Sequence, residues 1–366
     1  MFLSDIKMQS LLYLEKTKKK RSKEVYFCEE RKPMSRFRTD IKVADVFTMP
    51  RYGAPSFFLD TRGKVYVYIY GKYSDWSGLG KKMEAKIPTH VPLLENVKEV
   101  SCGNEHTAFL TRKGNVYMCG HGDTGALGFG SFRNRYIPTR LQMEKTRHVI
   151  CGHGYTMFLG YSSWKSGTHM ADVFSCGTGS KGQLGLGSCL TLTNTPKEVE
   201  SDSFGESPLE NIVCSYSRTF FLNKQGKVFM CGDSGSYLGE NQNFYVPVPF
   251  AVEGGPVRSI FCDVSYTVFL TGDKVIGCQH EMSGINILGA YNYNIPRIGE
   301  IIFPERIVSF SCGYYIGLFT SSSGKVYMRG NVGMYNDDDT LTLPLDNVKK
   351  TAVFGSSSAF FLRIKP

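Results

Sequence analysis

The sequence predicts an all-β protein, a seven-bladed β-propeller with about four strands in each blade. The first observation is a Phe-Leu step (Leu-Phe in the sixth copy) that recurs at intervals of 43 to 63 residues. Its copies are Phe58-Leu59, Phe109-Leu110, Phe158-Leu159, Phe221-Leu222, Phe269-Leu270, Leu318-Phe319 and Phe361-Leu362. The second observation is that most copies continue with a glycine, an apolar pair and a glycine-rich turn. A repeat of this length indicates similar structural units that are stable only when packed on one another.

The second copy contains the elements that we expect in each blade. The runs from Cys102 to Thr111 and from Asn115 to Cys119 are rich in β-branched, aromatic and apolar residues, as strands are. Lys113-Gly114 lies between them, where a hairpin needs a positive φ that glycine adopts without steric cost. The turn from Gly120 to Gly128 follows. No copy has a helical period, and about 50 residues with three or four strands are typical of one propeller blade.

The two ends of the chain predict how the ring closes. The last copy, Val348 to Ile364, contains only the first half of the repeat. The missing second half resembles Glu24 to Cys28, because that segment matches Asn115 to Cys119. Six complete copies and one blade shared by both termini would give seven blades. Such closure hides sheet edges that would otherwise template aggregation. We therefore expect one propeller over residues 24–366.

Residues 1–23 form a separate basic arm, which can include a short helix. The net charge is +10, and residues 1–40 hold 11 Lys or Arg against 6 Asp or Glu, half of the excess. The densest run contains Lys18, Lys19, Lys20 and Arg21. Such a run is typical of a nuclear import signal or of an arm on a phosphate backbone. The alternative is a solvated tail with no partner.

The cysteines indicate a reducing compartment. Most of the 11 occupy two repeat positions, represented by Cys102 and by Cys119, which favours buried small residues repeated blade by blade. There is no Cys-x-x-Cys, so we expect no zinc site, and no other motif predicts a metal or a cofactor. Nothing resembles a membrane span or a secretory signal. These features predict a monomer in the nucleus or cytoplasm that does not bind membranes.

The units Cys-Gly-x-x-His-Thr-x-x-Leu and Gly-x-Gly-x-x-Gly-x-Leu-Gly resemble the regulator of chromosome condensation family. The resemblance extends from about Val25 to Leu362, and the second copy matches best. It implies a seven-bladed propeller. Relatives of this type include exchange factors for the small GTPase Ran, chromatin-bound proteins, and propellers that serve as adaptors, so the fold does not choose among these functions.

The exchange-factor members use acidic and histidine residues on one propeller face. Several matching positions are occupied by other residues here: Asn104, Gly154, Leu186, Ser265 and Ser358. Glu105 lies beside Asn104, and His106 and Asp123 fit the repeat. We interpret His106 as a residue that holds neighbouring strands by hydrogen bonds. The irregular turn that contains Asp75 could replace a missing insert after the second copy.

Two inserts offer further candidate partner sites. A long hairpin tip in the third copy carries Trp164 and His169, and an exposed tryptophan on a loop often anchors a partner. The alternative is that Trp164 folds back on the propeller. The acidic insert Glu198 to Glu210 could meet a basic partner.

The sequence therefore predicts a non-catalytic protein-binding propeller, an adaptor or regulator. Its candidate partner-binding residues are Asp75, Asn104, Glu105, His106, Asp123, Trp164 and His169. The first alternative is an active guanine-nucleotide exchange factor for a Ran-type small GTPase. The second is a chromatin or DNA binder that uses the basic arm.

Overall fold

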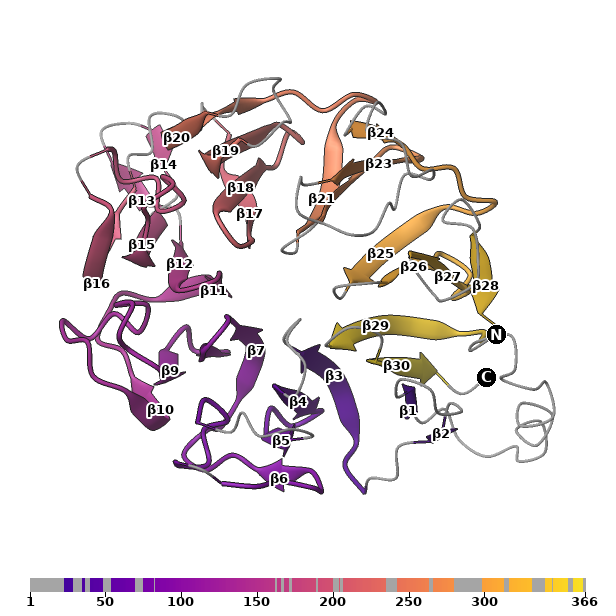
Figure 1. Ribbon diagram of the computed structural model, residues 1–366, viewed down its shortest axis with the longest axis horizontal. Coiled ribbons are helices and arrows are strands. Elements are labelled where there is room, and N and C mark those ends of the chain that lie inside the picture. Colours follow the sequence, from indigo (N-terminus) through magenta and orange to yellow (C-terminus); the bar gives the residue numbers. More distant parts are fainter. Residues whose placement is uncertain are drawn as a thin grey trace.

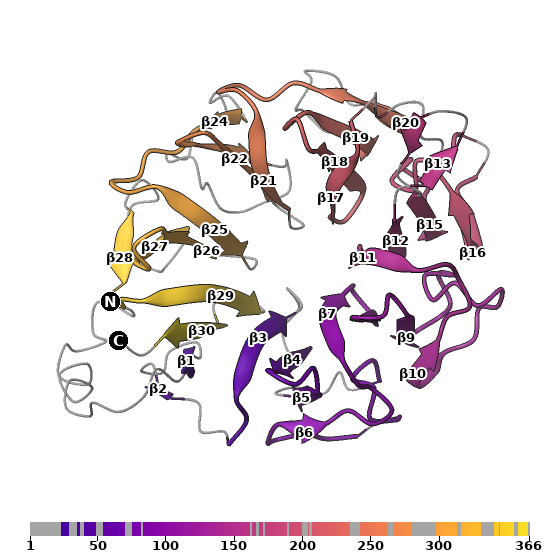
Figure 2. The same cartoon turned by 180° about the vertical axis from the view of Figure 1, so that it is seen from behind.

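The computed structural model describes most of the chain. The described residues are 23–28, 35–36, 40–48, 54–69, 75–81, 83–161, 163–165, 168–170, 173–188, 190–199, 204, 207–234, 242–262, 266–279, 298–312, 316–330, 340–343, 345–354 and 358–364. They form an all-β propeller, as predicted, in which the sheets are arranged around a central axis (Figure 1; Figure 2 from behind). The described part of the chain has no helix long and apolar enough to cross a membrane.

Each blade is an antiparallel sheet whose strands follow one another from the axis outward. The first blade consists of β3 (Val43–Thr48), β4 (Pro55–Asp60), β5 (Val65–Ile69) and β6 (Thr89–His90). The second consists of β7 (Val97–Cys102), β8 (His106–Thr111), β9 (Val116–Gly120) and β10 (Arg135–Arg140). The third consists of β11 (Thr146–Cys151), β12 (Tyr155–Gly160), β15 (Val173–Thr178) and β16 (Leu192–Glu198).

The other blades have the same order. The fourth consists of β17 (Leu209–Cys214), β18 (Arg218–Asn223), β19 (Val228–Asp233) and β20 (Asn243–Phe250). The fifth consists of β21 (Val257–Cys262), β22 (Tyr266–Thr271), β23 (Lys274–Gln279) and β24 (Ile298–Glu300). The sixth consists of β25 (Ile307–Cys312), β26 (Ile316–Ser321), β27 (Val326–Gly330) and β28 (Leu341–Leu343).

The predicted count of seven blades is wrong. The structure has six blades whose four strands are contiguous in the sequence, and one terminal sheet that combines strands from both ends of the chain. The last repeat supplies only β29 (Val348–Phe354) and β30 (Ser358–Ile364), so it cannot complete a four-stranded blade from its own residues. The N-terminal strands β1 (Lys23–Cys28) and β2 (Ser35–Arg36) complete that sheet in the order β2-β1-β30-β29. β1 pairs with β30 from Lys23↔Ile364 to Cys28↔Ala359, so both ends of the chain share one sheet.

The hydrophobic core lies between neighbouring blades. The second strand of a blade is covered on both faces, so all six residues of β8 and of β12 are buried. Aromatic rings bridge the blades: Phe57 and Phe109 meet edge to face at 5.6 Å, and so do Phe220 and Phe269 at 5.6 Å. Such pairs add about 0.5–1.5 kcal/mol beyond the burial of their area. Each blade is therefore stabilised mainly by its two neighbours.

A repeated pair of side chains also connects the blades. Thr107 and Cys119 both donate to the carbonyl oxygen of Trp76 in the preceding blade, at 3.0 and 3.4 Å. Thr156 and Cys176 donate in the same way to Ala126, at 2.8 and 3.4 Å. The third example of this Thr–Cys clamp is Thr219 and Cys231 on Gln183. Cys119, Cys176 and Cys231 are therefore buried free thiols that bind a backbone oxygen.

The strand order defines two faces of the propeller. The loops between the first and second strands of a blade, and between its third and fourth strands, emerge on one face, which we call the upper face. The turns between the second and third strands, and the connections between blades, emerge on the lower face. Loops that are distant in the sequence therefore meet on the upper face.

Candidate functional site

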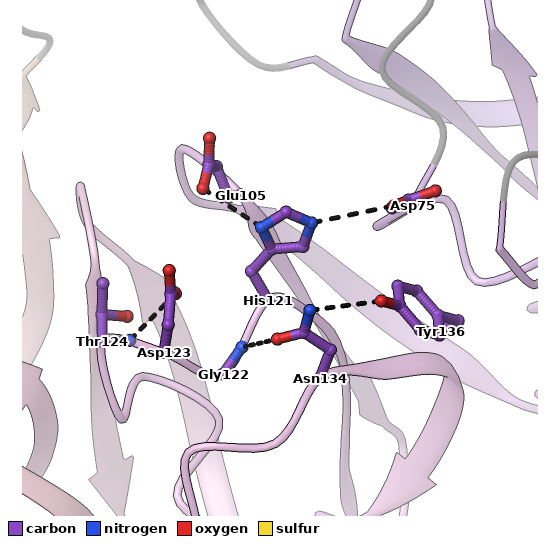
Figure 3. A network of polar contacts seen from close by, with 8 residues as sticks. All are labelled: Asp75, Glu105, His121, Gly122, Asp123, Thr124, Asn134 and Tyr136. Carbon is purple, nitrogen blue, oxygen red and sulfur yellow. Dashed lines mark hydrogen bonds and ion pairs between the residues drawn. The ribbon is translucent and has the colours of Figure 1, made fainter.

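The upper face brings three of the predicted partner-binding residues together. Asp75 lies in the turn between β5 and β6, Glu105 lies in the loop between β7 and β8, and Asp123 follows β9. All three surround His121, which directly follows β9 (Figure 3). We call Asp75, Glu105, His121 and Asp123 the His121 cluster. It combines residues of two adjacent blades.

Carboxylates face both nitrogens of the His121 ring. Nδ1 lies 3.3 Å from Oε2 of Glu105, and Nε2 lies 3.9 Å from Oδ2 of Asp75 (Figure 3). One ligand atom from each of Glu105, His121 and Asp123 can be chosen so that all lie within 4.8 Å of one another. The side chains of Asp75, Glu105 and His121 are 24%, 35% and 28% exposed, so solvent or a partner can reach them.

The His121 ring is held by the first blade. The indole of Trp76 meets it edge to face, with 5.5 Å between the ring centroids. Trp76 is buried, and its carbonyl oxygen is the acceptor of the Thr107–Cys119 clamp. The backbone N–H of His121 also donates to the carbonyl of Glu105 at 2.9 Å. The ring is therefore fixed relative to both blades before any partner binds.

Gly120 allows this close approach of the two loops. Its φ is +118°, and a Cβ there would lie 2.4 Å from the carbonyl oxygen of Glu105 and 3.0 Å from Cβ of Trp76. Any side chain at this position would push Glu105 and His121 apart, so only glycine fits.

The turn after His121 is shaped by side-chain hydrogen bonds. The N–H of Gly122 donates to Oδ1 of Asn134 at 2.9 Å, and the amide of Asn134 donates to the hydroxyl of Tyr136 at 3.2 Å. One oxygen of Asp123 accepts from the N–H of Thr124 at 3.0 Å. This bond orients the Asp123 carboxylate (Figure 3).

A cavity of about 430 Å³ lies at the upper end of the propeller axis, beside the cluster. It is lined by the last residues of the innermost strands and the first residues of the loops that follow them, including Asn104, His153 and Tyr216. The rings of His153 and Tyr216 lie 4.1 Å apart at its rim. Cys102 and Cys151 line its wall, and burial raises the pKa of Cys151 to about 12. Their thiols are therefore protonated at neutral pH, which makes them poor nucleophiles.

His106 lies apart from this surface, inside the propeller. Its Nε2 is 2.9 Å from Oγ1 of Thr156, in the next blade. Because the Thr156 hydroxyl donates its only proton to Ala126, Nε2 of His106 carries the proton of this bond. Burial lowers the pKa of His106 to about 4. This neutral imidazole links two blades, the arrangement that we expected for His106, and its side chain is only 2% exposed.

The other predicted positions are distributed as follows. Trp164 and His169 are register partners in a separate hairpin of β13 (Ser163–Lys165) and β14 (Thr168–Met170), and their side chains lie outside the described part. Gly154 has a φ of +120°, and a Cβ there would lie 3.4 Å from the side chain of Thr124. Leu186 packs against the core between the third and fourth blades. Ser358 is the first residue of β30.

Several predictions fall on residues outside the described part. They are the basic arm (Lys18, Lys19, Lys20 and Arg21), Ser265 and residues 200–203, 205 and 206 of the acidic insert. His121 is the residue of the site that the sequence analysis missed. Its signal was present, since the turn reads Gly-His-Gly-Asp, but nothing in the sequence places Asp75 opposite it.

Comparison with known proteins identifies the repeat. Residues 113–159 and 171–222 match the regulator of chromosome condensation (RCC1) repeat, and a second profile of the same repeat matches residues 97–126. The chain is a divergent propeller of the RCC1 repeat family. The predicted resemblance is thereby confirmed.

Three relatives show how far this RCC1 propeller has diverged. It is 28% identical to the RCC1 domain-containing protein RUG3, mitochondrial, of Arabidopsis thaliana, over 72% of this chain and 61% of that protein, so it spans about three-fifths of that relative's length. It is 18% identical to human WBSCR16, with a TM-score of 0.74 over 94% of this chain and 99% of that one. It is 16% identical to Prp20p of Saccharomyces cerevisiae, with a TM-score of 0.74 over 94% of this chain and 92% of that one. The Prp20p structure was described together with that protein's binding to Gsp1p and histones. At these identities the two solved structures establish the fold alone.

Proposed function

We propose that this RCC1 propeller is a non-catalytic adaptor or regulator that binds a protein partner on its upper face. The fold supports a regulatory or binding role, and the observation that carries the finer proposal is the His121 cluster beside the axial cavity. Three carboxylates gather there, although the chain as a whole carries a net charge of +10. A local charge opposite to that of the whole molecule favours one orientation of a basic partner segment.

The neighbouring cavity supplies the apolar part of such a surface. Tyr216 is 51% exposed at the cavity rim, and its ring packs on His153. Aromatic side chains are enriched at the centres of protein interfaces, whose rims are polar. The upper face therefore offers both charge and apolar area to one partner.

The alternative, guanine-nucleotide exchange on a Ran-type GTPase, is favoured by a different observation. Glu105 directly follows Asn104 and points toward His121, so a carboxylate is present one residue from the expected position (Figure 3). Two other positions argue against exchange, because Gly154 provides no side chain and Leu186 packs against the core. Exchange needs charged groups that compete with the phosphate and Mg²⁺ contacts of the GTPase, and these two positions supply none. We therefore favour the adaptor.

The test compares two matched sets of charge-removing variants. The upper-face variant combines Asp75→Asn, Glu105→Gln and Asp123→Asn. The lower-face control combines Glu95→Gln, Glu144→Gln and Asp273→Asn, which removes the same charge from exposed carboxylates on the opposite face. Partners captured by the wild-type chain are cross-linked and the contact residues are mapped by mass spectrometry.

We expect the upper-face variant to lose a partner that the control retains, and the cross-links to lie on the upper face. Cross-links confined to the lower face or to the basic arm would refute this proposal. Release of a fluorescent nucleotide from the Ran-type GTPase of the same organism is measured in parallel. Strong acceleration by the wild type that the upper-face variant loses would establish exchange instead of the adaptor role.

The cellular location is part of the same test. We propose a nuclear or cytoplasmic protein on the basis of the basic arm and the free thiols. RUG3 is named as mitochondrial, so the tagged full chain should be imaged against nuclear and mitochondrial markers. Mitochondrial signal would reject the proposed location.

A further inference from the structure

The His121 cluster has the composition and spacing of a metal site. It contains one imidazole and two carboxylates whose ligand atoms can all lie within 4.8 Å of one another. No cysteine is involved, so the absence of Cys-x-x-Cys from the sequence does not bear on it. We propose that Glu105, His121 and Asp123 bind a single divalent transition metal ion, with zinc as the best-fitting ion.

The distances fit a tetrahedral ion. Two ligand atoms that each lie about 2.0–2.2 Å from Zn²⁺ are about 3.3–3.6 Å apart in a tetrahedral site. Nδ1 of His121 and Oε2 of Glu105 are 3.3 Å apart, which already matches this separation. The Asp123 carboxylate lies within 4.8 Å of the other two ligand atoms and is exposed, so its side chain would have to approach them more closely to bind the same ion.

Asp75 lies beside the other nitrogen of the His121 ring. It faces Nε2 of His121 at 3.9 Å, while Nδ1 faces the proposed ion. A carboxylate opposite the ligating nitrogen is the usual outer partner of a metal-bound histidine, because it fixes the tautomer and raises the basicity of the ligand. The edge-to-face contact with Trp76 restricts rotation of the His121 ring. Asp75 is therefore a positioning residue, since it acts through His121.

Charge and ligand type select the class of ion. Glu105 and Asp123 bring two negative charges close together, which a divalent cation compensates. An imidazole ligand favours zinc and its transition-metal neighbours over Mg²⁺ and Ca²⁺, which prefer oxygen ligands alone. Three protein ligands leave a fourth position for water or for a side chain of a bound partner. This inference does not depend on the adaptor proposal.

The experiment titrates the metal-stripped full chain with Zn²⁺ in a calorimeter. We expect one ion per chain, and we expect His121→Gln to weaken binding by more than about tenfold. Asp75→Asn should weaken it by about tenfold while keeping the stoichiometry. The matched control is His148→Gln, because His148 pairs with Glu99 at 3.2 Å but has no third ligand in the described part of the chain. The control should bind zinc as the wild type does.

Cobalt substitution separates this site from the cysteines. Co²⁺ bound by His121 and the two carboxylates gives visible d–d absorption without a thiolate-to-cobalt charge-transfer band. Unfolding curves recorded with a chelator confirm that each variant is folded. Zinc affinity that is equal in the wild type and His121→Gln, or a thiolate band in the wild type, would overturn the proposal. Partner capture measured in the same chelator reports on the adaptor role separately.

Discussion

The composite terminal sheet leads to a sharp prediction about stability, because β1 is the strand that joins the two ends of the chain. Val25 packs toward the first blade with Val43, Val46 and Phe58. Tyr26 packs toward the sixth blade with Leu318 and Met328. One short strand therefore fills two interfaces, and its removal would open the ring on both sides.

The magnitude follows from these two side chains. Val25 and Tyr26 are each 3% exposed, and burying a large apolar side chain contributes about 1.5–3 kcal/mol. Deleting residues 1–28 should therefore cost at least about 3–6 kcal/mol, before the loss of the hydrogen bonds to β30. The total stability of a domain is about 5–15 kcal/mol, so we expect a large loss of stability or aggregation through the exposed edge of β30.

Urea unfolding and scanning calorimetry measure this effect. The control deletes residues 1–22 and leaves β1 intact, so it should unfold like the full chain. The single variant Tyr26→Ala removes one of the two buried side chains and should cost about 3–5 kcal/mol. Equal unfolding midpoints for the two deletions would refute the reasoning, because β1 would then contribute nothing to ring closure.

Three other predictions concern separate parts of the chain. The pKa of His106 in the folded protein lies below its unfolded value, so the contribution of His106 to the free energy of unfolding is fully present near pH 7 and falls as the pH drops from about 6.5 toward 4. In the presence of a chelator, the wild type should lose about 2 kcal/mol more of its free energy of unfolding than His106→Gln between pH 7 and pH 5. Gly120→Ala should destabilise far more than Gly255→Ala, since both have positive φ but only Gly120 has an atom within 4 Å of the added Cβ; equal melting temperatures would contradict this. Replacing residues 18–21 with alanine should reduce nuclear accumulation and any salt-sensitive DNA binding without changing the melting temperature, and unchanged localisation and binding would identify a solvated tail.

The repeat made most of the fold predictable. The Phe-Leu step lies in the second strand of each blade, and the Gly-rich turns lie where loops reach the upper face. These features recur because every blade solves the same packing problem against its neighbours. The match of Glu24 to Cys28 with Asn115 to Cys119 also predicted the partner of the last strand. The count of seven blades was wrong: six blades are contiguous, and the expected seventh is a composite sheet that also takes β2, a two-residue strand that the sequence period does not indicate.

The site was less predictable, since it depends on a departure from the repeat. Asp75, Glu105 and Asp123 were candidates for separate reasons, but their convergence on His121 requires the first and second blades to be side by side in a known register. Sequence spacing does not supply that register. His121 itself lies in a glycine-rich turn that recurs through the repeat, and nothing in that turn singles it out.

The Thr–Cys clamp explains how such a departure can arise without cost to the fold. The clamp binds only the backbone oxygen at its target position, so the side chain there is free to vary: it is Trp76 in the first blade, Ala126 in the second and Gln183 in the third. Only in the first of these is the side chain an aromatic ring, and that ring supports His121 in the next blade. The same bonds that hold the blades together therefore fix the platform beneath the His121 cluster, while the side chain at the target position differs from blade to blade.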